Sequence, residues 1–309
     1  MSRILVTGVS GLLGLNFALH AHGEEHQVIG VANTTPISGV DFKCLQAELT
    51  EPGIIEKLLD QEKPDLILHC AAIANVDACE TNPALAVEVN ADLPGRIAEA
   101  AGRHDIQLVH ISTDAVFNGQ KGDYSEDDEP NPLNVYARTK WEGEKAVASA
   151  NPRALIARVN FYGWSTSGTR SLAEFFFTNL SVGRPVSGFT DVFFCPLEVT
   201  SLAETLLELV RTGTSGIYHV VSRECLSKYE FGCRLAGQFG LDAALIQPAS
   251  VRDGGLVAAR SPNLLLRTDR LSAALGHPAP GQTEGLKRLH DAYLAGHPQR
   301  LRQISAGIL

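Results

Sequence analysis

The sequence predicts an α/β fold in which a doubly wound parallel sheet is followed by a smaller α/β region. Three observations lead to this prediction. An apolar, β-branched run at Arg3–Thr7 leads directly into a glycine-rich loop and a helix-like segment. Strand-like and helix-like segments then alternate to about residue 162, and the alternation loosens afterwards. Because alternating strands and helices form parallel sheets covered by helices on both faces, we expect that architecture here.

The loop after the first strand has the spacing Gly-x-x-Gly-x-x-Gly, and the helix behind it is expected to reach about His22. Gly8 allows the tight turn, Gly11 lets backbone amides approach a pyrophosphate, and Gly14 lets helix and strand pack closely. A bare match could be only a structural turn, but its place directly after a strand favours a Rossmann-type dinucleotide site. The expected cofactor contacts in this loop are Gly8, Ser10, Gly11, Leu12, Leu13 and Gly14.

The end of the second predicted strand, Gln27–Val31, bears on which dinucleotide binds. A ribose-reading Asp or Glu is expected about 20 residues after the glycine loop, and none stands in residues 32–35. A carboxylate there would hold the 2′-hydroxyl of NAD and repel the extra phosphate of NADP, so its absence favours NADP(H). No Arg stands there either, so NAD(H) stays open. Asn33 is either a cofactor contact or a turn residue, and Glu48 and Leu49 are expected at the adenine.

The next predicted strand, Leu66–Cys70, ends in small residues. Ala71 and Ala72 follow it, and small side chains at the carboxyl end of a strand leave room for a ligand, so Cys70, Ala71 and Ala72 are expected to line the cofactor. His69 and Cys70 themselves are interpreted as packing residues, because neither has a partner at ligand spacing. A helix is expected from about residue 83 to 103, and its Asn90 is either a polar residue on a core-facing stripe, which the sequence alone favours, or a group that positions a water.

Tyr136 and Lys140 lie four residues apart in a segment that Asn134 can cap and that is expected to be helical to about Ala150. Residues at i and i+4 share a helix face, roughly 5–6 Å apart. A tyrosine has a pKa of about 10, so its phenolate near neutral pH costs roughly 4 kcal/mol, and a fixed lysine cation can lower that cost. The pair suits proton transfer at a carbonyl or alcohol carbon, although the spacing alone is also common on solvated helix faces.

A second sign of catalysis is the polar end of the predicted strand Gln107–Ile111. Ser112, Thr113 and Asp114 follow it, about two dozen residues before the tyrosine. Hydroxyl groups at the carboxyl end of a central strand can reach the substrate oxygen that Tyr136 would protonate.

After the catalytic segment, a strand is expected at residues 154–159, helices at about 171–182 and 201–211, and a returning strand at 216–221. We expect a dinucleotide-binding domain at residues 1–162, with a return segment at about 194–221. Residues 163–193 and 222–309 are expected to form a smaller, mostly C-terminal substrate-binding domain that closes over the cofactor fold.

Composition excludes several classes of protein. The 309 residues are 44% hydrophobic and carry a formal net charge of −9, which argues against nucleic acid as the main partner. No apolar run reaches the roughly 18–20 residues of a membrane span, and the N-terminus leads straight into a strand, so we expect a cytoplasmic protein. The six cysteines (44, 70, 79, 195, 225 and 233) include no Cys-x-x-Cys pair, so we expect reduced thiols without disulfides or a metal site.

Four longer strings, taken with the glycine loop and the tyrosine and lysine, resemble the extended short-chain dehydrogenase/reductase family over nearly the whole chain. Together they look like its dTDP-4-dehydrorhamnose reductase branch, whose members reduce a 4-keto sugar nucleotide with NADPH or NADH. The strings are Ala74–Glu80, Ser112–Gly119, Pro132–Lys140 and Gly216–Val220.

The resemblance implies roles for individual residues. Tyr136 would be the general acid, Lys140 the modifier of the phenol pKa and a ribose contact, and Thr113 the hydrogen-bond partner of the substrate carbonyl. Hydride would pass from nicotinamide C4 to the C4 carbonyl of the sugar. The resemblance also implies Asn90 as the family's helix asparagine, Asp114 beside the substrate, Asn160 and Phe161 at the cofactor, and Arg260 either at the substrate diphosphate or in a structural salt bridge.

Departures from the family pattern concern the substrate more than the chemistry. Ala115 follows Thr113-Asp114 where 4,6-dehydratases have Glu, which argues against dehydration. Phe161 stands where the reductases often have Trp, and Arg267 where they often have Asp or Asn. The alternatives are a sugar-nucleotide epimerase, a reductase for another deoxysugar, or a regulatory subunit like that of methionine adenosyltransferase. The expected partner is a nucleotide sugar, without nucleic acid or membrane, and a homodimer is left open.

Overall fold

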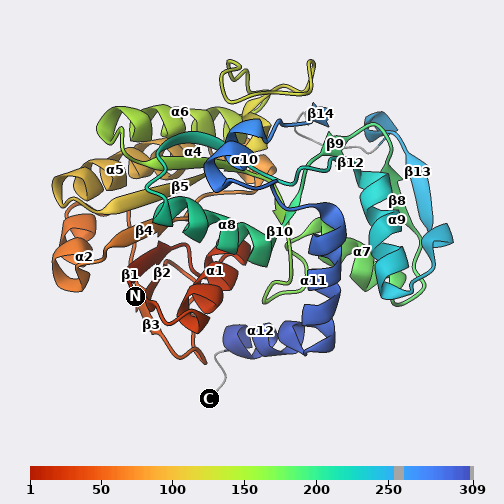
Figure 1. Cartoon of the computed structure of the whole chain (residues 1–309), viewed down its shortest axis with the longest axis horizontal. Helices are drawn as coiled ribbons and strands as arrows, with labels where there is room; N and C mark the ends of the chain where they lie inside the picture. The colour runs from red at the N-terminus through yellow and green to blue at the C-terminus, as the bar shows by residue number, and fades with distance from the viewer. Residues whose placement is uncertain (254–260, 307–309) are drawn as a thin grey trace.

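A seven-stranded parallel sheet forms the framework of the computed structural model, which describes residues 1–253 and 261–306 (Figure 1). The strand order β11-β6-β5-β4-β1-β2-β3 confirms the predicted doubly wound fold. The order reverses between β1 and β4, and ligands bind outside the carboxyl ends of the strands at such a switch point. The strands are β1 (Arg3–Thr7), β2 (Gln27–Ala32), β3 (Lys43–Gln46), β4 (Leu66–His69), β5 (Gln107–Thr113), β6 (Leu155–Val159) and β11 (Gly216–Val220).

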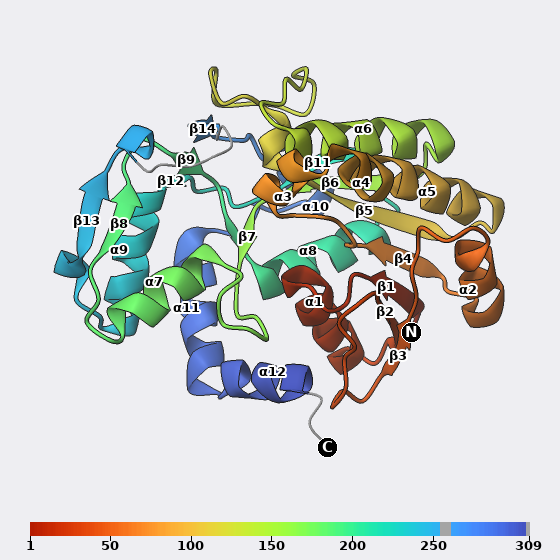
Figure 2. The same ribbon diagram turned by 180° about the vertical axis from the view of Figure 1, so that it is seen from behind.

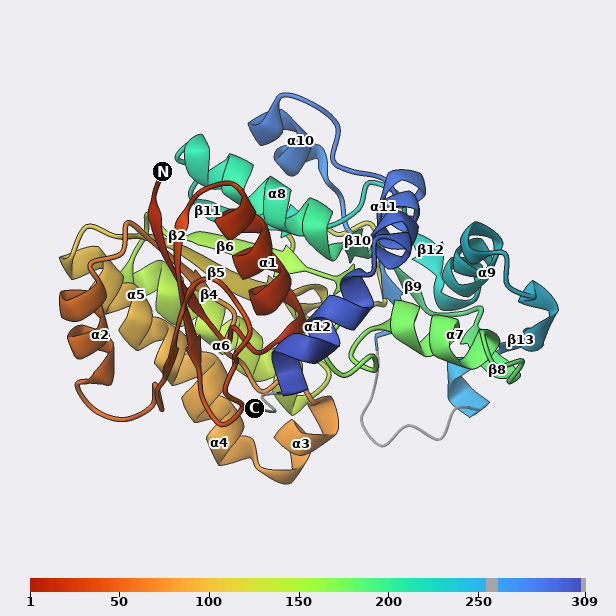
Figure 3. The same cartoon turned by 90° about the horizontal axis from the view of Figure 1, so that it is seen from below.

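Helices cover both faces of this sheet (Figure 3). They bury two separate apolar cores against it. One core joins the sheet to α1, α8 and α10 through residues such as Phe17 and Leu202, and the other joins it to α2, α5 and α6 through residues such as Ile97 and Val147. The helices are α1 (Leu12–Gly23), α2 (Ile54–Glu62), α3 (Val76–Thr81), α4 (Pro83–Val87), α5 (Leu93–Arg103), α6 (Val135–Ala150), α8 (Val199–Arg211) and α10 (Asp269–Leu275).

The helix expected from residue 83 to 103 is interrupted by a π-helical turn, η1 (Glu88–Asp92). In a regular α-helix the carbonyl of Asn90 would accept from the amide of residue 94, which is a proline and has no N–H. In the π-helical turn the amide of Leu93 donates to Glu88 instead. A Cβ atom at Gly143 would lie 2.2 Å from the Asn90 carbonyl oxygen, so this glycine is required for the close packing of α6 on the turn.

The rest of the chain forms a smaller α/β region beside the sheet (Figure 2). Its core contains Trp164, Phe176, Phe231 and Leu289. α10, however, returns to pack against β11 and α8 of the large sheet, and the domain boundaries stay a prediction. The elements of this part are β7 (Phe161–Tyr162), α7 (Leu172–Leu180), β8 (Val186–Phe189), β9 (Phe193–Phe194), β10 (Leu197–Glu198), β12 (Leu226–Ser227), α9 (Lys228–Phe239), β13 (Ile246–Ala249), β14 (Asn263–Leu264), α11 (Gln282–Leu294) and α12 (His297–Ala306).

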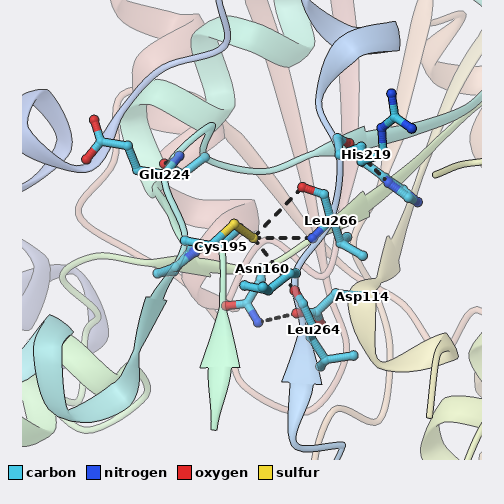
Figure 4. Close-up of a disulfide and its surroundings, with 12 residues drawn as sticks. Asp114, Asn160, Cys195, His219, Glu224, Leu264 and Leu266 are labelled. Carbon is cyan, nitrogen blue, oxygen red and sulfur yellow. Dashed lines mark hydrogen bonds between the residues drawn. A yellow bond between two sulfur atoms is a disulfide. The ribbon is translucent and has the colours of Figure 1, made fainter. Parts of the chain in front are cut away.

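Two cysteines form a disulfide, and the expectation that all six thiols are reduced is therefore wrong. The bond joins Cys195 to Cys225 (Figure 4). β12 pairs antiparallel with β9 and sets Leu226 opposite Phe194, so the neighbouring cysteines also face each other. The pairing involves strands of two residues, which leave no periodic pattern in the sequence. The other four cysteines are free thiols.

Among the helices of the described segments, none is both long enough and apolar enough to cross a lipid bilayer.

Candidate active site

A cleft of about 420 Å³ opens at the switch point of the sheet. Nine of the residues predicted to contact the cofactor line it: Gly8, Ser10, Gly11, Asn33, Glu48, Leu49, Cys70, Ala71 and Ala72. They come from the glycine loop and from the segments that follow β2, β3 and β4, so the structure brings together residues that are more than 60 positions apart. The cleft lies within the size range of small-molecule and cofactor sites.

The glycine loop fits a dinucleotide. Gly8 has a φ of +66°, and a Cβ there would lie 2.7 Å from the backbone nitrogen of Ala71. A Cβ at Gly14 would lie 2.4 Å from the carbonyl oxygen of Gly8. Gly11 caps α1 in an extended conformation, and the first turn of the helix holds no acidic residue. The N-terminus of α1 therefore offers backbone amides beside the cleft, with no carboxylate in its first turn to compete with a pyrophosphate.

Tyr136 meets Thr113 where α6 begins beside the end of β5. Their side chains are hydrogen-bonded to each other, so the two hydroxyl groups predicted to share the substrate oxygen lie side by side. Burial raises the pKa of Tyr136 to about 12, and the bond from Thr113 opposes that shift only in part. The phenol is thus protonated at neutral pH, which is the state required of a general acid in a reduction.

Lys140 is buried one turn further along α6. Its Nζ donates to the carbonyl oxygen of Ile111 at 2.7 Å, and the residue is 3% exposed. Burial lowers the pKa of Lys140 to about 8, against the opposing effects of Glu144 and Cys70. We expected this lysine to lower the pKa of Tyr136, but that pKa is raised because burial outweighs every other influence on the phenol.

Asp114 adds a buried carboxyl group beside the hydroxyl pair (Figure 4). Asn160 donates its amide to one carboxyl oxygen at 2.6 Å, and Thr113 donates to the other at 3.2 Å. Burial raises the pKa of Asp114 to about 6, while these bonds and the charge of Lys228 lower it. The predicted residues Thr113, Asp114, Tyr136 and Asn160 therefore form one connected group.

Asn90 is fully buried and its amide is occupied by the surrounding chain. It accepts from the backbone nitrogen of Ile73 at 2.9 Å and donates to the carbonyl of Ile73 at 3.1 Å. It also donates to Thr139 of α6 at 3.3 Å. These bonds connect the loop after β4 to the catalytic helix, so the geometry favours a positioning role for Asn90 over contact with substrate.

The remaining predicted residues lie outside the connected group of Thr113, Asp114, Tyr136 and Asn160. Leu12, Leu13 and Gly14 belong to the first turn of α1, and Phe161 is half-buried in β7. Arg267 is exposed and pairs with Asp269 at 2.8 Å. Arg260, the candidate for the substrate diphosphate, lies outside the described residues. Within the described ranges no cluster of His, Cys, Asp or Glu is arranged to hold a metal ion.

The sequence analysis missed a buried ionic network behind the catalytic residues. Glu144 and Arg158 are each 2% exposed and pair at 2.8 Å. Ser112 donates to the same carboxylate at 2.5 Å, and the Arg158 guanidinium lies 3.5 Å from His219. Two signals could have revealed this network. Glu144 follows Lys140 at i+4, and Arg158 interrupts an otherwise apolar strand.

Arg170 is a second residue that the sequence analysis missed. It lines the cofactor cleft and donates to the carbonyl oxygen of Ser10 at 2.7 Å. Nothing in the local sequence signals this contact, because 160 positions separate the two residues.

The chain is similar in sequence to proteins of one known family. A family model described as the RmlD substrate binding domain matches residues 1–295. The chain is 35% identical over 292 residues to the probable low-salt glycan biosynthesis reductase Agl14 of Haloferax volcanii, across 93% of this chain and 97% of that protein. It is 30% identical over 294 residues to methionine adenosyltransferase 2 subunit beta of Bos taurus, across 90% and 84% of the two chains.

Among solved structures, the fold matches dTDP-4-dehydrorhamnose reductase of Bacillus anthracis in complex with NADP, with a TM-score of 0.83 and 25% identity. The match covers 94% of this chain and 99% of that one. The expected resemblance to reductases of this branch is thereby confirmed.

Proposed function

Since the chain belongs to the RmlD substrate-binding domain family, we propose that it is an NAD(P)H-dependent reductase of a 4-keto sugar nucleotide. The first candidate substrate is dTDP-4-dehydrorhamnose, which would be reduced to dTDP-L-rhamnose. The observation that carries the proposal is the protonated Tyr136 hydroxyl, hydrogen-bonded to Thr113 beside a cleft built for a dinucleotide. A bound nicotinamide would supply the hydride, and both NADPH and NADH are candidates.

The protein's own residues account for the proton and for the orientation of the carbonyl. Tyr136 donates a hydrogen bond to the substrate oxygen, and Thr113 turns its single hydroxyl proton from Asp114 to the same oxygen, which polarises the carbonyl and favours attack at carbon. As negative charge develops on that oxygen, Tyr136 gives up its proton. Lys140 lies four residues further along the same helix, and its positive charge would stabilise the phenolate that remains. The Ala115 amide donates to Thr113 Oγ1 at 3.1 Å and keeps the hydroxyl in position, while Asn160 holds the neighbouring Asp114 carboxyl group.

The proposal is tested by following NADPH and NADH oxidation with a panel of 4-keto nucleotide sugars, beside a Tyr136→Phe variant as the inactive control. We expect the wild-type protein to oxidise the cofactor with at least one dTDP-linked 4-keto sugar. Binding of a dinucleotide without consumption of it, for every sugar in the panel, would contradict a reductase.

A regulatory role is the second candidate, and the similarity to methionine adenosyltransferase 2 subunit beta is the observation that favours it. The complete set of Thr113, Tyr136 and Lys140 favours catalysis. Co-purification of the protein with a methionine adenosyltransferase, together with no reductase activity, would support the regulatory role. An epimerase is distinguished by retention of its nicotinamide cofactor through turnover and purification.

A further inference from the structure

Arg170 reaches the cofactor cleft from the opposite half of the molecule. It lies in the loop between β7 and α7, whereas the rest of the cleft comes from the first half of the large domain. Its Nη1 donates to the carbonyl oxygen of Ser10, in the glycine loop, and it lines the same cleft as Asn33 and Thr34. The guanidinium is exposed, so a ligand in the cleft can reach it.

The backbone beneath Arg170 is firmly held. Its amide donates to the Glu174 carboxylate at 2.8 Å, and that carboxylate is 1% exposed. Ser165 donates to the same carboxylate at 2.9 Å, and Ser171 caps α7 in a reciprocal capping box with Glu174. The stem of the arginine is therefore fixed at its base, which lowers the entropy lost when its guanidinium binds an anion.

The charges that line the cleft show why a cation is needed there. Among the described lining residues, Arg170 is the only lysine or arginine, and Glu48 is the only acidic group. Hydrogen bonds from Thr50 and Asn33 lower the pKa of Glu48, so its carboxylate is ionised. The N-terminus of α1 can hold a pyrophosphate, but a phosphate nearer Asn33 and Glu48 would meet a like charge unless an arginine offsets it.

We propose that Arg170 binds a phosphate group of the dinucleotide, and that this group is the 2′-phosphate of NADP(H). The inference rests on the dinucleotide of the proposed function and deepens it by assigning the cofactor preference to one residue. An arginine that reads this phosphate normally follows the second strand, and none stands there in this chain. The cation comes instead from a loop about 140 positions later in the sequence, which meets the glycine loop at Ser10.

The test measures dissociation constants by titration calorimetry in the absence of any sugar substrate. Arg170→Gln is compared with the wild type for NADPH, NADH, adenosine 2′,5′-bisphosphate and adenosine 5′-monophosphate. Because a charge-assisted hydrogen bond to phosphate is lost, we expect the variant to bind NADPH and the bisphosphate about tenfold or more weakly than the wild type does. NADH and the monophosphate should change by less than about threefold. Arg184→Gln is the matched control, because Arg184 is also exposed and contacts Asn179 outside the cleft.

Each outcome is decisive. Equally weakened binding of NADPH and NADH would assign Arg170 to the pyrophosphate and overturn the 2′-phosphate inference, and unchanged dissociation constants would overturn any phosphate contact. Thermal melting of both variants checks that the fold is intact. A wild-type protein that binds neither dinucleotide would refute both this inference and the proposed function. Binding that depends on Arg170, in a protein that reduces no sugar, would refute only the reductase.

The reciprocal variant Glu48→Gln tests the same charge balance from the other side. Removing the carboxylate should strengthen the binding of NADPH relative to that of NADH by about a few-fold, because the 2′-phosphate no longer meets a negative charge. A Glu48→Gln variant with an unchanged ratio of the two dissociation constants would contradict a 2′-phosphate in this part of the cleft.

Discussion

Helix α6 contributes to two buried ionisable pairs, Tyr136 with Lys140 on the helix itself and Glu144 with Arg158 of β6, and burial affects the two pairs differently. Glu144 is enclosed with Arg158, whose guanidinium donates to both carboxylate oxygens, so each charge is compensated inside the protein. Tyr136 and Lys140 lie two turns and one turn earlier on the helix, and neither is in direct contact with a group of opposite charge among the described residues. Burial therefore raises the pKa of Tyr136 to about 12 and lowers that of Lys140 to about 8.

The difference separates a structural pair from a catalytic one. Compensated charges hold their ionisation states and position the surrounding chain, whereas uncompensated groups acquire shifted pKa values that suit proton transfer. The two pairs are also connected, because Glu144 raises the pKa of Lys140 against the effect of burial. The buried network thus keeps Lys140 closer to its charged form.

Removing the proton donor should give the largest effect on the catalytic pair. We expect Tyr136→Phe to lower kcat by about three orders of magnitude or more, roughly 4 kcal/mol in transition-state stabilisation. The dissociation constant for NADPH should stay within about threefold, because the phenol is needed for proton transfer and the cleft is unchanged. Steady-state kinetics and calorimetry measure the two quantities. Turnover near the wild-type rate would remove Tyr136 from the mechanism.

Breaking the compensated pair should instead cost stability. Glu144→Ala leaves the Arg158 charge buried without its partner, and we expect a loss of about 3–5 kcal/mol in the free energy of unfolding. Urea denaturation measures the change. Glu142→Ala, two positions earlier on the same helix, is the control and should change stability by less than about 1 kcal/mol. Similar effects of the two substitutions would show that the buried pair has no special place in the fold.

Lys140→Met should show a stability difference that depends on pH. The pKa of Lys140 is lowered from 10.5 to about 8 in the folded state, so both states hold the proton at pH 7 and the folded state bears the full cost of burying the charge. Between pH 8 and 10.5 the unfolded state holds a proton that the folded state has lost, so the wild type gains stability as pH rises.

Relative to Lys140→Met, this gain should approach about 3 kcal/mol. Chemical denaturation of both proteins at several pH values measures it. A stability difference that does not vary with pH would show that Lys140 is not desolvated in the folded protein.

The stability difference between the wild type and Asp114→Asn should depend on pH in the opposite direction, and the change should be somewhat smaller. The pKa of Asp114 is raised from 3.8 to about 6, so the cost of burying its charge is fully present above pH 6. As pH falls from 6 to 3.8, the folded state binds a proton before the unfolded state, and the wild type gains about 2–3 kcal/mol relative to the variant. Denaturation at pH 4.5 and pH 7 gives the comparison. A gain in the other direction would mean that hydrogen bonds from Asn160 and Thr113 outweigh burial.

The sequence predicted the features that depend on short-range patterns. Apolar runs and the glycine spacing located the strands and the cleft, and the i, i+4 spacing paired Tyr136 with Lys140. The rule that ligands bind at strand ends added Thr113 and Asp114.

The features that the sequence did not predict depend on contacts between distant segments. Arg170 acquires its place only when the loop before α7 meets the glycine loop, and the Cys195–Cys225 disulfide depends on the pairing of two very short strands. The partner of Glu144 lies on β6, beside the strand that ends in Thr113. No periodic pattern in the sequence indicates these long-range contacts.

The most direct test of hydride transfer at this site uses NADPH that carries deuterium on one face or the other of nicotinamide C4. The wild-type protein is incubated with dTDP-4-dehydrorhamnose, and the product is examined by mass spectrometry and NMR. A reductase that works through Tyr136 and Thr113 should place one deuterium at the sugar C4 from one cofactor face only, and Tyr136→Phe should place almost none in the same time. A bound cofactor that transfers no deuterium to any 4-keto nucleotide sugar would contradict the account.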